Sequence, residues 1–178
     1  DEQMINSFCD KYEHILNQYD GFIVTHTPCF SLLYERFQKP IIVVASTRYE
    51  DPFSHDKYKW EHFNNFLQKK IDEGIVIPVS NNKYDARYTE HFTKRPWPVI
   101  PSLCEYTKTD YLREPEKNDY FLYSSKFPLP TVVNNLVPKS SALRPGYTWD
   151  RLCSFKGIVH IPYNVSTMSI FEQYTSNI

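Results

Sequence analysis

Residues 22–45, FIVTHTPCFSLLYERFQKPIIVVA, decide the fold class because they read as a strand, a helix and a strand in immediate succession. The two ends, Phe22–Thr25 and Ile41–Ala45, are apolar runs of the kind found in parallel strands that are buried on both faces. Between them, Thr27 is expected to cap a helix and Pro28 to occupy its first position, where no amide is needed. The segment therefore predicts a compact βαβ unit.

The same alternation of strands and helices continues on both sides of this unit. Apolar residues at helical spacing, Ile5, Phe8, Tyr12, Ile15 and Leu16, predict a helix that ends at Asp20-Gly21. The other elements expected in the first hundred residues are a helix capped by Ser54 and ended by Gly74, a strand at 75–79 whose Pro78 is typical of a sheet edge, and a helix capped by Asn81 or Asn82.

The polar residues 105–119 are predicted to connect two domains. Beyond them, strands are expected at 120–123 and 158–161, with a largely irregular stretch at 126–146. A last helix from Ser166 is expected to turn Ile170, Phe171 and Tyr174 inward. The predicted fold is α/β with two Rossmann-like parallel-sheet domains, residues 1–105 and 106–178, each incomplete at its outer end.

Composition excludes several classes of protein. The 178 residues are 41% hydrophobic and carry a net charge of −1, so the basic face of a nucleic-acid binder is not expected. Four widely spaced cysteines without a CxxC pair argue against a zinc site or a disulfide framework and for a reducing, cytoplasmic setting. The chain begins at Asp1 rather than Met, and we expect it to be a piece of a longer protein, which leaves membrane association open.

The C-terminal residues 158–178, IVHIPYNVSTMSIFEQYTSNI, hold the strongest candidate site. They predict a strand, a tight loop and a helix N-terminus, and ligands of open α/β sheets bind outside the carboxyl ends of the strands. Free amides near Thr167 and Met168 would suit a phosphate. Glu172 follows just over one turn further on, where its carboxylate could accept hydrogen bonds from a ribose. The alternative is that Glu172 faces solvent and Ser166 is an ordinary cap.

This segment resembles the donor site of glycosyltransferases with two Rossmann-like domains, the GT-B type, in which two Glu residues stand eight positions apart. The resemblance implies that Glu172, as the second Glu, binds the nucleotide ribose, and that Asn164 replaces the first Glu, which contacts the donor sugar. It further implies that the amides of Thr167 and Met168 bind the diphosphate, and Ser166, at the start of the helix, is counted with them among the donor-binding residues.

Three residues outside this segment are further candidates through the same resemblance. Lys126, after the first strand of the second domain, could pair with the donor diphosphate, although an exposed Lys without a role is the alternative. His26 follows the first strand of the first domain and could be a catalytic base, or a structural histidine. Arg48 follows the next strand and could orient the acceptor.

The resemblance implies transfer of a sugar from a nucleotide diphosphate sugar to a carbohydrate or other hydroxyl acceptor. No cofactor or metal is expected, because the sequence has no DxD pair near a strand end and no Gly-rich dinucleotide motif. The alternatives are a sugar-nucleotide epimerase of the same fold and a non-catalytic module that retains the fold. We expect the chain as given to have no transferase activity.

Overall fold

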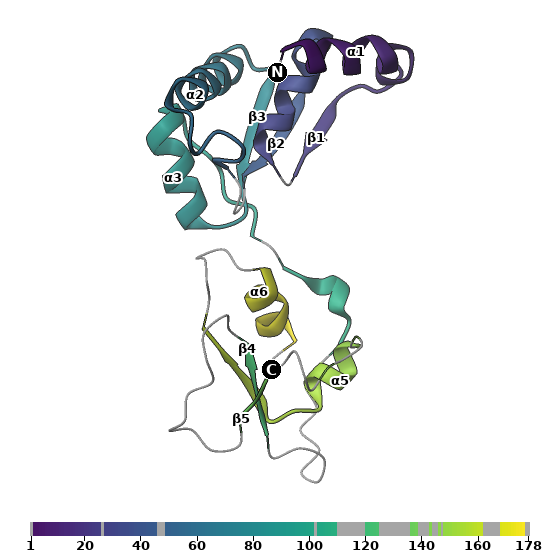
Figure 1. Cartoon of the computed structure of the whole chain (residues 1–178), viewed down its shortest axis with the longest axis vertical. Coiled ribbons are helices and arrows are strands. Elements are labelled where there is room, and N and C mark those ends of the chain that lie inside the picture. Colours follow the sequence, from purple (N-terminus) through teal and green to yellow (C-terminus); the bar gives the residue numbers. More distant parts are fainter. Residues whose placement is uncertain are drawn as a thin grey trace. The chain divides into compact units, whose positions relative to one another are not determined.

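The computed structural model of the chain is an α/β protein with two small parallel sheets (Figure 1). It describes residues 2–25, 27–45, 49–101, 103–109, 120–124, 136–138, 143, 146, 148–161 and 168–176. The chain divides into two compact units, Asp1–Pro101 and Ser102–Ile178, whereas the sequence placed the boundary after residue 105. Each unit has its own sheet and its own cluster of buried apolar side chains.

The first unit contains the predicted strand–helix–strand segment. Its strands β1 (Phe22–Val24), β2 (Ile41–Ala45) and β3 (Val76–Ser80) lie in the order β1-β2-β3, and all of them are parallel. Alternate side chains of β2, those of Ile41, Val43 and Ala45, are fully buried. The apolar run that predicted a buried strand is therefore the centre of the sheet.

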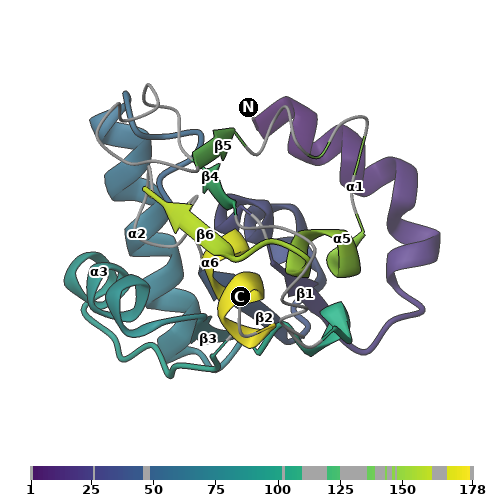
Figure 2. The same cartoon turned by 90° about the horizontal axis from the view of Figure 1, so that it is seen from below.

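Helices pack in two pairs in the first unit. The helix α1 (Glu2–Leu16) contacts the helix η1 (Pro28–Phe37), and the Cys9 thiol donates to the Leu33 carbonyl over 3.2 Å. The helices α2 (Lys57–Asp72) and α3 (Lys83–Thr93) lie side by side (Figure 2).

Two of the predicted caps differ in the structure. Thr27 and Pro28 occupy the predicted N-cap and first positions of η1, but η1 is a 3₁₀-helix and the Thr27 side chain makes no cap bond. The cap of α2 is Asp56 rather than Ser54, since the Asp56 carboxylate accepts from the Lys59 amide over 3.0 Å.

The Asn82 cap of α3 is the one that the sequence anticipated. Its side-chain oxygen accepts from the amides of Tyr84 and Asp85, both over 2.9 Å. Replacing Asn82 by alanine leaves both amides without this acceptor and should lower the unfolding free energy of the first unit by about 1 kcal/mol. Urea unfolding measures the loss, with the exposed Lys83→Ala as the neighbouring control. Equal stability of the two variants would contradict the capping role.

The second unit has the strands β4 (Phe121–Ser124), β5 (Leu136–Pro138) and β6 (Gly157–His160), with the short helix α5 (Trp149–Cys153) before β6. All three strands are parallel, in the order β5-β4-β6. The strand β5 lies in the stretch that the sequence predicted to be irregular, since three residues that end in a proline give no periodicity.

The last helix of the second unit, α6 (Met168–Thr175), turns a different face inward from the predicted one. Tyr174 was expected to face inward, but its side chain is 83% exposed, whereas Gln173 and Ser176 are buried. The short helix η2 (Glu105–Thr107) contacts α6, and the Ser176 hydroxyl donates to Thr107 Oγ1 over 3.3 Å. The polar Gln173 is therefore more deeply buried than the aromatic Tyr174 that follows it.

Candidate functional site

The carboxyl edge of the second sheet contains a topological switch point. The chain passes from the central β4 to β5 on one side, and then to β6 on the other side of β4. Ser124 and His160, the last residues of β4 and β6, are partners in the parallel register. In sheets of this order, ligands bind in the crevice outside the ends of the two strands at which the direction of winding reverses.

Glu172 lies on α6, the helix that follows β6. Its side chain is half-buried, and Oε1 accepts a hydrogen bond from the Tyr106 hydroxyl of η2. This bond, together with partial burial and the charge of Glu172, raises the pKa of Tyr106 well above its usual range. The other carboxylate oxygen, Oε2, also has acceptor positions, because a carboxylate can accept several hydrogen bonds.

Further contacts fix the segment that carries Tyr106. The Thr175 hydroxyl of α6 donates to the Leu103 carbonyl over 2.5 Å, and Thr107 contacts Ser176. The Cys104 thiol is buried, and burial followed by the charge of Glu172 raises its pKa. The Tyr106 ring is nevertheless 61% exposed, so it can leave Glu172 without opening the core.

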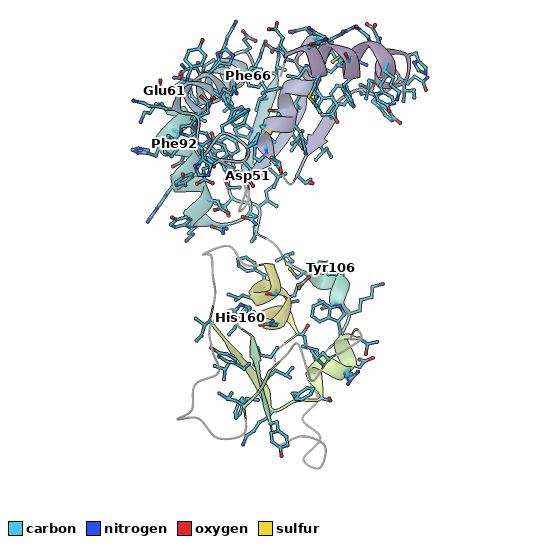
Figure 3. All side chains as sticks on the ribbon, in the orientation of Figure 1. Asp51, Glu61, Phe66, Phe92, Tyr106 and His160 are labelled. Carbon is cyan, nitrogen blue, oxygen red and sulfur yellow. The ribbon has the colours of Figure 1, made fainter. Side chains whose placement is uncertain are left out.

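His160 is a candidate that the sequence reasoning missed. It ends β6, and its Nδ1 lies 3.3 Å from Oε1 of the buried Gln173 on α6. Tyr106 and His160 therefore contact α6 from two different segments of the second unit (Figure 3). The signal in the sequence was a titratable residue at the carboxyl end of the predicted strand 158–161, which is the position where such sheets bind ligands.

Most of the other predicted site residues lie outside the described residues. Met168 is the first described residue of α6, and its side chain is not described. Of the predicted site residues, the structure therefore places Glu172 and the backbone of Met168. The candidates outside the described residues are His26, Arg48, Lys126, Asn164, Ser166 and Thr167.

Two absences hold for the described part of the chain. Within it, no three His, Cys, Asp or Glu side chains come close enough to hold a metal ion. No helix among the same residues combines the length and the apolar character that crossing a membrane requires.

Comparison with protein-family models, with curated proteins and with solved structures finds no match to the chain. The case for a function therefore depends on the residues and the geometry of the chain itself.

Proposed function

We propose that the chain is part of a glycosyltransferase of the two-Rossmann-domain type, and that its second unit binds a nucleotide diphosphate sugar. The observation that carries the proposal is the position of Glu172, on the helix that follows β6 at the switch point between β4 and β6. A half-buried carboxylate there has the chemistry to accept hydrogen bonds from the two hydroxyls of a ribose.

The start of α6 supplies the second part of the proposed donor site. The first amides of a helix have no acceptor within the helix, and the dipole gives that end a partial positive charge. A diphosphate next to Met168 would therefore gain hydrogen bonds and electrostatic stabilisation without a metal ion. The same groups would stabilise the diphosphate as it leaves the sugar.

Titration calorimetry with UDP, GDP, ADP and CDP tests the proposal. We expect at least one of them to bind with one-to-one stoichiometry, and the matching nucleoside without phosphates to bind more weakly. Binding is the appropriate measurement because the proposal concerns the donor site of the second unit. Failure of all four nucleotides to bind would overturn the proposal and would favour a non-catalytic module of the same fold.

Replacing Tyr106 by phenylalanine should tighten nucleotide binding about fivefold. In the free protein the Tyr106 hydroxyl donates to Glu172 Oε1, so it competes with a ribose hydroxyl for this oxygen. One such hydrogen bond contributes about 1 kcal/mol. The same titration measures the change, and Tyr120→Phe, a nearly half-exposed tyrosine next to β4, is the control. Weaker binding by Tyr106→Phe would show instead that the hydroxyl positions the carboxylate.

A further inference from the structure

The first unit has a cavity of about 560 Å³ beside the segment that follows β2. This volume is in the range of pockets that take small molecules. Polar side chains dominate its lining, with the carboxylates of Glu50 and Asp51, the hydroxyl of Ser54 and the imidazole of His55. The position of Asp51 in this unit is labelled in Figure 3. Nothing in the proposed donor site involves these residues.

Aromatic rings form the other part of the lining, and their positions are fixed by packing. The rings of Trp60 and Tyr88 both pack edge-on against the buried Tyr49, at centroid distances of 5.2 and 6.2 Å. The Tyr49 hydroxyl donates to Asn64 Oδ1 over 2.6 Å, and Asn64 Nδ2 donates to the Trp60 carbonyl over 2.8 Å. The aromatic wall is therefore preorganised rather than assembled on binding.

Glu50 lines the cavity next to this wall. Burial, followed by the neighbouring Glu50 carboxylate, raises the pKa of Tyr88 well above its usual range. The Glu50 side chain is half-buried, and its carboxylate has acceptor positions for the hydroxyl groups of a ligand.

The charges around the cavity restrict the ligand class. Two carboxylates face one ammonium group, that of Lys57, whose side chain is largely exposed and lies 3.7 Å from Glu61. A phosphate or another strong anion would meet net repulsion here. An apolar ligand would leave the carboxylates without hydrogen bonds. A neutral ligand that is rich in hydroxyl groups satisfies the carboxylates and can lay its C–H face on the rings.

We infer that this cavity binds a saccharide through Glu50, Asp51 and the wall formed by Trp60 and Tyr88. The site would hold the carbohydrate acceptor of the proposed transferase. This acceptor role rests on the proposed function, whereas the binding of a saccharide does not. Hydroxyls of the sugar donate to Glu50 and Asp51, while its less polar face packs on the aromatic side chains.

Saturation-transfer NMR with the methyl glycosides of glucose, galactose, mannose and N-acetylglucosamine tests the inference on the whole chain. At least one glycoside should receive magnetisation from the protein. The Glu50→Gln and Tyr88→Phe substitutions should each raise its dissociation constant about tenfold, which corresponds to one hydrogen bond to a charged group.

Two substitutions at a different groove of the same unit provide matched controls. Glu2→Gln and Tyr58→Phe make the same chemical changes on α1 and α2, at residues that do not line the cavity, and should leave glycoside binding unchanged. Far-ultraviolet circular dichroism of each variant verifies folding, and Asp51→Asn, at an exposed residue, replaces any variant that does not fold.

Three outcomes would overturn the inference. The first is that no glycoside receives magnetisation from the protein. The second is that the cavity variants and the wild type bind the glycoside with equal affinity. The third is preferential binding of glycine or inorganic phosphate, which would assign the cavity to a zwitterion or an anion. Nucleotide binding is measured separately. A chain that binds nucleotides but no glycoside would contradict only the saccharide site, and the opposite result would contradict only the donor site.

Discussion

Replacing Glu172 by alanine is expected to weaken nucleotide diphosphate binding by about 1.5–3 kcal/mol, or about ten- to hundredfold in the dissociation constant. The carboxylate is the charged acceptor proposed for the ribose hydroxyls, and a hydrogen bond to a charged group contributes this amount. Titration calorimetry of the wild type and the variant measures the change directly.

A second variant separates charge from contact at Glu172. Glu172→Gln keeps an oxygen that can accept from Tyr106 but removes the charge, so it should lose less affinity than the alanine variant. Glu105→Ala removes an exposed carboxylate of η2 and should leave binding unchanged. Equal losses for Glu105→Ala and Glu172→Ala would show that net charge, rather than a specific contact, governs binding.

Replacing Trp97 by alanine is expected to destabilise the first unit by about 3–5 kcal/mol. Trp97 is 2% exposed, its indole N–H donates to Thr93 Oγ1 over 2.9 Å, and its ring packs edge-on against Tyr49 at a centroid distance of 5.9 Å. The substitution leaves a cavity in the core and removes the N–H group that donates to Thr93. Urea unfolding followed by circular dichroism measures the loss.

The matched comparisons for Trp97 test the origin of this loss. Trp97→Phe keeps most of the ring volume and should cost less than the alanine variant. Tyr58→Ala truncates an aromatic side chain that is 79% exposed and should change stability by less than about 0.5 kcal/mol. A Trp97→Ala loss as small as that of Tyr58→Ala would mean that the first unit is not organised around this core.

Elements with a strong apolar pattern were the ones that the sequence predicted correctly. The runs at 22–25 and 41–45 became β1 and β2, because consecutive apolar residues favour burial in a parallel sheet. Only β2 is the central strand, and Ile23 of the edge strand β1 is 66% exposed. The cap of α3 is one of the two expected residues, Asn82, because its amide side chain immediately precedes the helix. In these cases local chemistry and the tertiary fold favour the same structure.

Sequence reasoning was wrong where a tertiary contact changed the local preference. On α6 the polar Gln173 is buried next to His160 of β6, whereas Tyr174 is exposed. Ser176, directly after the helix, is buried against Thr107 of η2. The pattern of apolar residues cannot reveal this, since it assumes that the most hydrophobic side chains are the buried ones.

Only part of the candidate site follows from the sequence. Glu172 is a candidate there because its predicted strand, loop and helix are contiguous, but Tyr106 stands 66 residues earlier, and no local pattern links the two. His160 lies near the carboxyl end of the predicted strand, and this position becomes a functional signal once the strand order places it at a switch point. The Tyr106 contact requires the packing of η2 on α6, and the position of His160 requires the sheet topology.

The measurement that tests the central claim most directly is an amide NMR titration of the chain with the nucleotide diphosphate that binds in calorimetry. The account predicts saturable shifts in the second unit, at His160 and through the first turn of α6 from Met168, together with a shift at Tyr106. Shifts confined to the first unit, or saturation without any change in α6, would contradict a donor site at the carboxyl edge of β4 and β6.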